Sequence, residues 1–320
     1  MISVVVPVFN MKVFLPRCMR MLLKQKGDYE IILVNDGSTD GSKELCDQYA
    51  SEYSQLVRVV HKENGGLSSA RNTGISKAKG EYVIFPDPDD WVEPNFIKRM
   101  EELQQKYSPD LLCIGHFVEF ESNSVKANEK QTLKQMTGLQ AQRALLVAPC
   151  INGFAWNKLY HLDIIRSHKI KFLDSVGTTE DLDFAYRYLQ HCEKIVFSPG
   201  DRLYHYYQRN GAATHSGFSQ KKIDSIKTYE KIIKDSTDKK MVCAAEEEIC
   251  NTAINLMWSY QESYLQDKDI EKQLREYIKK YLNCYCRSQK YGIGRKVQAV
   301  LAYCTPKLYA WIKNRISERI

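Results

Sequence analysis

The chain has 320 residues and is 43% hydrophobic, which is enough to bury one large core or two modest ones. No run of about 18 apolar residues occurs, so we expect no segment that spans a bilayer. The start, M-I-S-V-V-V-P-V-F-N, lacks a basic region and a cleavage site, and we interpret it as a first strand instead of a signal peptide. The net charge of +7 suits an anionic partner, such as a nucleotide or an acidic membrane surface.

The ten cysteines are scattered along the chain without the spacing of a metal site. Cys284 and Cys286, for example, are separated by one residue, which is not a zinc pattern. Since no export signal is evident, we expect reduced thiols and a cytoplasmic location.

The first 120 residues alternate between strand and helix patterns. Apolar and β-branched runs predict strands over residues 2–8, 31–34, 56–60, 82–85 and 111–120. Helices are expected over residues 14–26, around Leu45, after the glycine-containing loop H-K-E-N-G-G-L, and from Pro94 as a first helical residue. This alternation predicts an α/β fold, in which helices flank a mostly parallel, Rossmann-like sheet with right-handed crossovers.

Polar clusters follow three of the expected strands. They are Phe9-Asn10, the run from Asn35 to Ser38, and the run from Asp87 to Asp90. Ligands of parallel sheets bind outside the carboxyl ends of the strands, so we expect these clusters to meet at one edge.

The stretch F-P-D-P-D-D-W places three carboxylates, Asp87, Asp89 and Asp90, directly after an apolar run. Like charges this close repel unless a cation holds them. One interpretation is a solvated surface turn. The other is a site where Mg²⁺ or Mn²⁺ meets substrate phosphates, beside the basic residues Lys62 and Arg71. The convergence of strand ends favours the metal site.

Four stretches in this half carry a family resemblance: V-V-V-P-V-F-N, I-I-L-V-N-D-G-S-T-D-G-S, H-K-E-N-G-G-L-S-S-A-R-N-T-G and G-E-Y-V-I-F-P-D-P-D-D-W. In order and spacing they resemble the nucleotide-binding half of family 2 of the glycosyltransferases, with the GT-A fold. The resemblance implies inverting sugar transfer from a nucleotide-sugar, usually a UDP-sugar, with Mn²⁺ or Mg²⁺. Two departures are visible, because Asn35 replaces a frequent aspartate and Pro88 stiffens the D-x-D turn.

The resemblance also implies roles for individual residues. Asp89 would ligate the metal directly, Asp87 would face the ribose or the metal, and Asp90 would support the turn or the donor sugar. His205 would either reach the metal or diphosphate or be structural. The nucleotide-sugar site as a whole would comprise Pro7, Phe9, Asn10, Asp36, Lys62, Asn64, Arg71, Asp87 and Asp90.

The second part, residues 137–220, resembles the family more loosely, through G-F-A-W-N-K-L-Y and T-T-E-D-L-D-F-A-Y-R-Y. Inverting transfer needs a base for the acceptor hydroxyl. We predict Asp181 as that base with Glu180 beside it, and keep Asp183 as a rival. Ordinary acidic residues in a first helical turn are the other interpretation. Trp156 and Lys158 are predicted near the acceptor or the diphosphate, with core packing as the alternative for Trp156.

The remaining residues read as helical, with apolar spacing over 241–265 and 270–284 and a basic tail from Arg287. We expect a GT-A catalytic domain over 1–220, divided at residue 110, and a helical region over 221–320. The stretch 211–216 is predicted to close over the donor. In the tail, Pro306 begins a helix whose Leu308, Ile312, Ile316 and Ile320 share a face near Trp311. This helix either lies on an anionic membrane or packs on the catalytic domain.

The sequence therefore predicts a metal-dependent inverting glycosyltransferase at the inner face of a bacterial membrane. It would act on a glycan or lipid-linked saccharide in capsular or exopolysaccharide synthesis. Two rival functions stay open: a nucleotidyltransferase, which would release pyrophosphate, and a non-catalytic protein that binds nucleotide-sugars. No nucleic-acid partner is expected.

Overall fold

The structure is a computed structural model, and it describes residues 1–120, 124–125, 132–147, 151–209, 217–263, 265 and 267–317. The chain forms two compact units. The first comprises Met1–Asp174 and Glu180–Asn210, and the second comprises Ser175–Thr179 and Gly211–Ile320.

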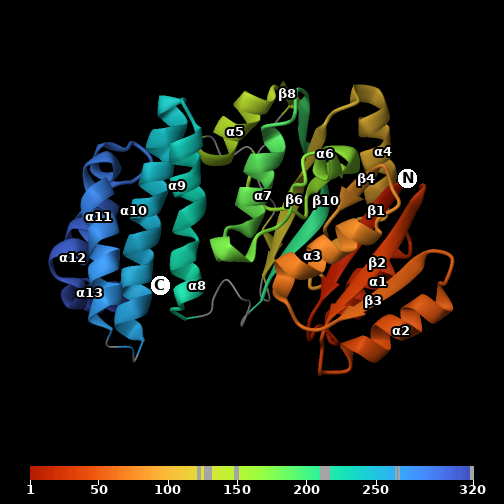
Figure 1. Ribbon diagram of the computed structural model, residues 1–320, viewed down its shortest axis with the longest axis horizontal. Coiled ribbons are helices and arrows are strands. Elements are labelled where there is room, and N and C mark those ends of the chain that lie inside the picture. The colour runs from red at the N-terminus through yellow and green to blue at the C-terminus, as the bar shows by residue number, and fades with distance from the viewer. Residues whose placement is uncertain are drawn as a thin grey trace. The chain divides into compact units, whose positions relative to one another are not determined.

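The first unit is an α/β unit whose strands and helices largely alternate (Figure 1). Its strands are β1 (Ile2–Val8), β2 (Tyr29–Asp36), β3 (Val57–Lys62), β4 (Tyr82–Ile84), β5 (Trp91–Val92), β6 (Leu111–Phe120), β7 (Ser124–Val125), β8 (Lys134–Met136), β9 (Lys158–His161) and β10 (Ile195–Gln208). Its helices are α1 (Leu15–Leu22), α2 (Ser42–Glu52), α3 (Gly66–Lys77), α4 (Phe96–Tyr107), α5 (Gly138–Leu146), α6 (Leu162–Ser167) and α7 (Glu180–Leu189). The short 3₁₀ turn η1 (Asp174–Val176) lies where the chain passes between the units.

All of these strands belong to one sheet with the order β3-β2-β1-β4-β9-β6-β10-β5, while β7 pairs with β6 and β8 with β10. The four strands β3, β2, β1 and β4 are parallel, as the sequence predicts. Beyond β4 the sheet is mixed, because β9 enters antiparallel between β4 and β6. The carboxyl ends of the parallel strands therefore share one edge, which positions the site described below.

Helices cover both faces of the sheet, so the unit has three layers. Residues of α1, α2 and α4 pack on one face, against the alternate side chains Val4, Val6 and Val8 of β1. Residues of α3, α5, α6 and α7 pack on the other face, around Val5. A Cβ atom on Gly74 of α3 would lie 2.1 Å from Val5 Cγ1, so only glycine lets α3 approach β1 this closely.

Two helix boundaries differ from the sequence prediction. The first helix ends at Leu22 instead of residue 26. Beyond it, the N–H of Gln25 donates to the carbonyl of Leu22 in a tight turn, and Gly27 has a φ of 131°, which is not helical. Helix α4 begins at Phe96 after an N-cap at Asn95, so Pro94 precedes the helix instead of opening it.

The second unit is a set of helices with a core of its own (Figure 1). They are α8 (Gln220–Asp224), α9 (Ile226–Asp235), α10 (Lys239–Glu262), α11 (Lys268–Arg287), α12 (Ile293–Cys304) and α13 (Pro306–Ser317). The two long helices, α10 and α11, pack together and agree with the predicted helical segments. In the described part of the chain, no helix is both long and apolar enough to cross a membrane.

Helix α13 begins at Pro306 as predicted, and it packs on the helical unit. Tyr309 and Ala310 are buried, and Tyr309 joins the helical core, whereas Leu308 and Trp311 are 46% and 58% exposed. Asn314 also accepts a hydrogen bond from the indole of Trp258 on α10, at 2.8 Å. The helix is therefore packed on its own unit and presents Leu308 and Trp311 outward. Ile320 lies outside the described residues.

Candidate active site

The loops after β1 and β2 are joined to each other at the carboxyl edge of the sheet. The backbone N–H of Asn10 donates to Ser38 Oγ at 3.1 Å, and the N–H of Thr39 donates to Asn10 Oδ1 at 2.8 Å. Asn10 has a φ of 53°, a left-handed conformation that asparagine tolerates well. The convergence of these two strand ends, predicted from topology alone, is thus present in the structure.

Asp36 is the buried anchor of the predicted nucleotide pocket. It is 2% exposed, and its carboxylate accepts from Lys62 Nζ at 2.5 Å and from the backbone N–H groups of Gly65 and Gly66 at 3.0 and 2.8 Å. The loop that opens α3 is therefore held on the end of β2. The resemblance places Asp36 at the nucleotide base, and this role stays a prediction.

The other predicted nucleotide residues line the same edge. Phe9 is 45% exposed directly after β1, while Pro7 is buried in that strand opposite Val34. Asn64 is exposed, and its backbone nitrogen would lie 2.8 Å from a Cβ on Gly37, whose φ is 72°. Glycine at position 37 therefore lets the two loops touch.

Arg71 of α3 links two acidic segments that are far apart in sequence. Its Nη1 lies 2.5 Å from Asp181 Oδ1, and its Nη2 lies 3.0 Å from Asp87 Oδ1. Arg71 is only 1% exposed and stands 5.2 Å from the ring centroid of Phe172. Burial disfavours its charge, but Asp181 and Asp87 outweigh that effect and raise the pKa of Arg71. The guanidinium is thus a fixed cation between the predicted metal turn and the predicted base.

The turn from Asp87 to Asp90 is fastened to β10. The N–H of Asp90 donates to the carbonyl of Asp87 at 3.1 Å, and the N–H of Asp87 donates to the hydroxyl of Tyr204 at 3.0 Å. Asp90 is 1% exposed and accepts from the Tyr204 hydroxyl at 2.6 Å and from the N–H of Tyr207 at 2.8 Å. Of the two roles that the sequence left open for Asp90, these bonds support the one in which it holds the turn.

Asp89 pairs with an arginine that the sequence analysis did not identify. Arg209 Nε donates to Asp89 Oδ2 at 2.8 Å, just after β10 ends. Arg17 of α1 donates to the carbonyl of Asp89 at 2.6 Å and stacks 3.9 Å from the Trp91 ring centroid. Because each partner is distant along the chain, no local pattern could have shown that these arginines surround the acidic turn.

The acidic turn is an unusual electrostatic environment. Burial raises the pKa of Asp87, the carboxylates of Asp89 and Asp181 add to the increase, and Arg71 opposes it. Burial and the neighbouring carboxylates also raise the pKa of Asp90 well above its usual range. A divalent cation would relieve this concentration of negative charge.

The predicted base and its rival occupy different environments at the start of α7. Asp181 accepts from the N–H of Ala155 at 3.0 Å in addition to its bond with Arg71, and it is partly exposed. Glu180 precedes it and is also partly exposed. Asp183 is fully buried and bound by Arg187, whose Nε donates at 2.8 Å. The geometry therefore favours Asp181 over Asp183.

His205 is engaged by the protein itself. Its Nδ1 lies 2.9 Å from Glu119 Oε1, and its Nε2 lies 2.9 Å from Glu93 Oε1. Its ring also stacks with Trp91 and Phe117 at centroid distances of 4.9 and 4.8 Å. Since both ring nitrogens have carboxylate partners, this arrangement corrects the metal assignment and matches the structural alternative.

Trp156 and Lys158 also need correction as acceptor residues, because both are buried. Trp156 is 2% exposed and stacks on Tyr204 at 4.5 Å. The Lys158 ammonium is enclosed by three oxygen acceptors, those of the Phe154 carbonyl and of the Asn152 and Asn157 side chains, at 2.5–3.2 Å. Phe154 is instead 41% exposed and stacks on Trp156 at 5.1 Å. It offers the accessible aromatic face that was predicted for Trp156.

The segment 211–216, predicted to close over the donor, lies outside the described residues. The structure therefore gives no outcome for that expectation.

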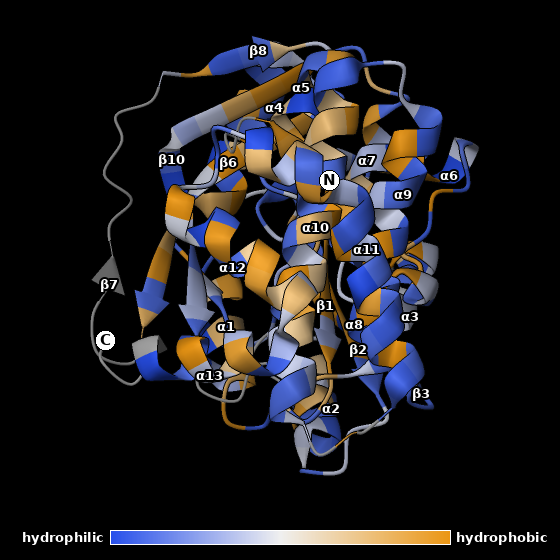
Figure 2. Ribbon diagram, turned by 90° about the vertical axis from the view of Figure 1, so that its left-hand side faces the viewer, coloured by the Kyte–Doolittle hydropathy of each residue, from blue (hydrophilic) through white to orange (hydrophobic). Residues whose placement is uncertain are grey.

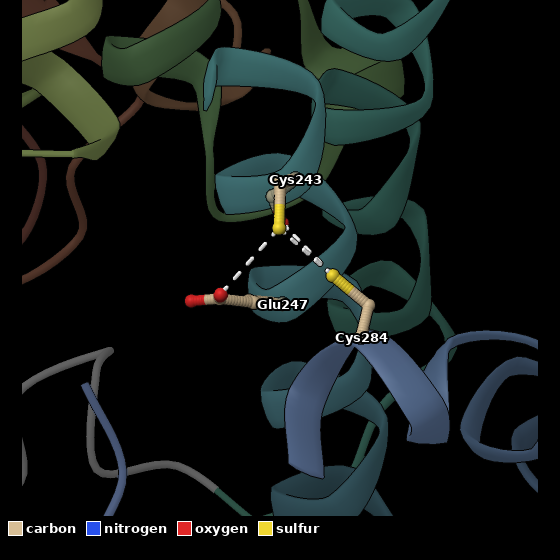
Figure 3. A group of neighbouring side chains, drawn as sticks. All are labelled: Cys243, Glu247 and Cys284. Carbon is tan, nitrogen blue, oxygen red and sulfur yellow. Dashed lines mark hydrogen bonds between the residues drawn. The ribbon is translucent and has the colours of Figure 1, made fainter. Parts of the chain in front are cut away.

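A second group of possible metal ligands lies in the helical unit (Figure 3). Cys243 Sγ is 3.0 Å from Cys284 Sγ and 3.7 Å from Glu247 Oε1. Two thiolates about 2.3 Å from one tetrahedral zinc ion lie about 3.7 Å apart, so this pair is too close to share an ion as it stands. Burial, then Cys243 and Glu246, raise the pKa of Cys284, which also disfavours a thiolate. We interpret the group as a pair of neutral thiols.

Known proteins resemble this chain in both sequence and fold. A model described as Glycosyl transferase family 2 matches residues 3–166. EpsH of Bacillus subtilis (strain 168), named as a glycosyltransferase, is 33% identical over 212 residues, which are 64% of this chain and 60% of EpsH. The chain thus spans less than two thirds of the length of that relative.

Two solved structures share the fold. S. aureus TarS 1-349 in complex with UDP-GlcNAc has a TM-score of 0.70 at 18% identity, over 97% of this chain and 89% of TarS. The mannosyltransferase PcManGT from Pyrobaculum calidifontis, in complex with GDP-Man and Mn²⁺, has a TM-score of 0.55 at 13% identity, over 98% and 84%. These likenesses confirm the predicted GT-A fold with a helical C-terminal region.

Proposed function

Because the chain belongs to glycosyl transferase family 2, we propose that it transfers a sugar from a UDP-sugar to a hydroxyl group with inversion at the anomeric carbon. The acceptor class is a glycan or a lipid-linked saccharide in bacterial surface-polysaccharide synthesis. The relative EpsH supports the enzyme class, and TarS, which was solved with UDP-GlcNAc, supports the donor class.

The observation that carries this proposal is the Arg71 bridge. It holds Asp87, at the strand end where a donor diphosphate would lie, and Asp181, at the start of α7, on one guanidinium. A sugar donor and an acceptor base must face each other across a short distance for direct displacement. A surface turn would have no need of a buried cation that connects it to a second acidic segment.

The acidic turn fits a hard divalent cation. Arg71 engages one oxygen of Asp87 and Arg209 one oxygen of Asp89, and carboxylate oxygens are the ligands that Mg²⁺ and Mn²⁺ prefer. Burial raises the pKa of Asp87 and the carboxylates of Asp89 and Asp181 raise it further, so a divalent cation would stabilise its charged form. We assign Asp89 and Asp87 as the residues that would hold the ion. When bound, the ion would supply charge neutralisation for the UDP leaving group.

The residues of the chain account for the other parts of the reaction. The acceptor oxygen attacks the anomeric carbon from the face opposite UDP, the bond from that carbon to the UDP oxygen breaks, and Asp181 takes the proton of the acceptor hydroxyl. Arg71 and the Ala155 N–H orient the carboxylate of Asp181. Arg209 is placed to exchange its bond with Asp89 for the donor diphosphate, because an arginine fork suits phosphate oxygens.

The acceptor would lie on Phe154 in this scheme. Its ring is exposed on one side and backed by Trp156 and Tyr206. An exposed aromatic face can pack against the C–H surface of a sugar ring, and the stack behind Phe154 keeps that face in position.

The decisive experiment removes the carboxylate of Asp89. With UDP as the probe, we expect Mn²⁺ to raise the melting temperature of the wild-type protein, because ligand binding to the folded state stabilises it. This shift should disappear with EDTA and in Asp89→Ala. The matched control is Glu102→Ala, which removes an exposed carboxylate of α4 that pairs with Arg99. If Mn²⁺ and UDP raise the melting temperature of Asp89→Ala as much as that of wild type, Asp89 is not a metal ligand.

Turnover distinguishes the rival functions. Purified protein incubated with a panel of UDP-sugars and Mn²⁺ should release UDP by slow hydrolysis or by transfer. Release of pyrophosphate from a sugar phosphate and UTP would identify a nucleotidyltransferase instead. Binding of a nucleotide-sugar without any release of product would identify a non-catalytic binding protein.

Binding of Mn²⁺ in the presence of UDP should weaken as the pH is lowered. Burial raises the pKa of Asp87, so this carboxylate takes up its proton at a higher pH than an ordinary aspartate, whose pKa is about 4. Metal binding requires the deprotonated form. The affinity for Mn²⁺, measured by calorimetry, should therefore be highest in alkaline buffer. As the pH is lowered, it should fall before the pH at which an ordinary aspartate takes up a proton. An affinity that stays constant down to about pH 5 would contradict the role of Asp87.

A further inference from the structure

The last two helices present apolar side chains to solvent. On α12, Ile293, Val297 and Val300 are 82%, 52% and 43% exposed, with the spacing of one helical face. On α13, Leu308 and Trp311 are exposed to 46% and 58%, also one turn apart. We call these five residues the apolar ridge. They follow one another along two consecutive helices that pack together.

The ridge reverses the usual pattern of a surface helix, which buries its large apolar residues and exposes polar ones. The inward side of α12 carries the small residues Ala299 and Ala302, both fully buried in the helical core. Ile293, Val297 and Val300 are exposed instead, while Leu301 packs against the core. Figure 2 shows the apolar segments of α12 and α13 in orange. Exposed apolar surface grouped in this way marks an interaction site.

The charges around the ridge have one sign. Residues 287–317 contain no aspartate or glutamate, and their cations are Arg287, Lys290, Arg295, Lys296, Lys307, Lys313 and Arg315. Lys307 and Arg315 are exposed on α13, next to Leu308 and one turn beyond Trp311 respectively. Arg315 stands 5.6 Å from the Trp311 ring centroid. Three of these cations have partners on α10: Lys290 pairs with Glu248, and Arg295 and Lys313 contact Asn255.

We infer that the apolar ridge and its exposed cations dock the second unit on an anionic lipid surface. Aliphatic side chains, a tryptophan and flanking lysine or arginine match the boundary between acyl chains and headgroups. A second copy of the chain is a poorer occupant, since α12 and α13 carry cations and no carboxylates of their own and would repel the same helices of a copy. The sequence placed membrane contact on the face of Leu308, Ile312, Ile316 and Ile320, near Trp311. The exposed residues keep Leu308 and Trp311 and add the outward side of α12.

Vesicle flotation of the full chain tests this inference without any nucleotide-sugar. The vesicles are phosphatidylcholine with about 30% phosphatidylglycerol, or phosphatidylcholine alone, in about 0.1 M and 0.5 M salt. The wild-type protein should float with the anionic vesicles and much less with neutral ones or at high salt. The double variant Val297→Asn/Trp311→Asn should bind at least about tenfold more weakly. The matched control, Leu139→Asn, alters a 52% exposed leucine on α5 and should bind like wild type.

Several results would overturn the inference. They are wild-type protein that does not float with anionic vesicles, a double variant that floats as well as wild type, or a loss of binding in the Leu139→Asn control. Dimers seen by light scattering that dissociate in the double variant, without vesicle binding, would assign the ridge to a second copy. Thermal unfolding of both variants must match wild type, and we expect this because the altered side chains are exposed.

Discussion

Asp181→Asn should lower the rate of sugar transfer by about 10²–10⁴-fold while leaving affinity for the UDP-sugar almost unchanged. Asparagine keeps the size of the side chain and can still accept from the N–H of Ala155, but it loses the ion pair with Arg71, so we expect a lower melting temperature as well. It cannot accept the proton of the acceptor hydroxyl. The measurement is turnover with saturating donor and acceptor, together with calorimetric binding of UDP and Mn²⁺. Donor hydrolysis measured without acceptor should also fall, since water would need the same base.

Asp183→Asn is the matched control for this substitution, because it makes the same change two residues later on α7. Asp183 is buried on Arg187, so its replacement should lower the melting temperature but leave the rate at saturating substrate within a few-fold of wild type. If Asp183→Asn instead removes transfer in a folded protein and Asp181→Asn does not, the base is Asp183.

The nucleotide-binding half was predictable because its signals are local. Strand patterns such as residues 2–8 and 111–120 coincide with β1 and β6, and parallel strands necessarily bring their ends to one edge. Asp36 ends β2, and Asp87 and Asp89 follow β4, so topology alone predicted that they lie at the same edge of the sheet. The mixed second half was harder, because β9 inserts between strands that precede it in the sequence.

The sequence could not show which side chains contact one another in the fold. The roles of Trp156, Lys158 and His205 depend on which atoms surround them, and in each case the surrounding groups come from other segments. The same limit hid Arg209, which meets Asp89 across 120 positions. It also hid the outward side of α12, since an apolar helical pattern predicts burial unless the packing of its small residues is known.

Arg71→Lys is the prediction that separates the bridge from simple charge balance. Lysine keeps the positive charge but offers a single ammonium, so it cannot span Asp181 and Asp87 with two nitrogens as the guanidinium does. Two largely desolvated carboxylates would then share an imperfect partner. Because breaking a buried ion pair costs about 3–5 kcal/mol, Arg71→Leu should lose about that much stability and Arg71→Lys part of it. Both should lose sugar transfer, since the metal turn and the base lose their common anchor.

The test combines urea unfolding with transfer assays on the same samples. Arg99→Lys serves as the control. Two nitrogens of Arg99 donate to the carboxylate of Asp201, but this arginine is partly exposed. It should change stability by less than about 1 kcal/mol and leave transfer intact. Adding Mn²⁺ and UDP should restore part of the stability of Arg71→Lys, because the cation offsets the unpaired charge of Asp87. Full transfer activity in a folded Arg71→Lys would mean that Asp87 and Asp181 need only a nearby positive charge, and that the bridge does not align them.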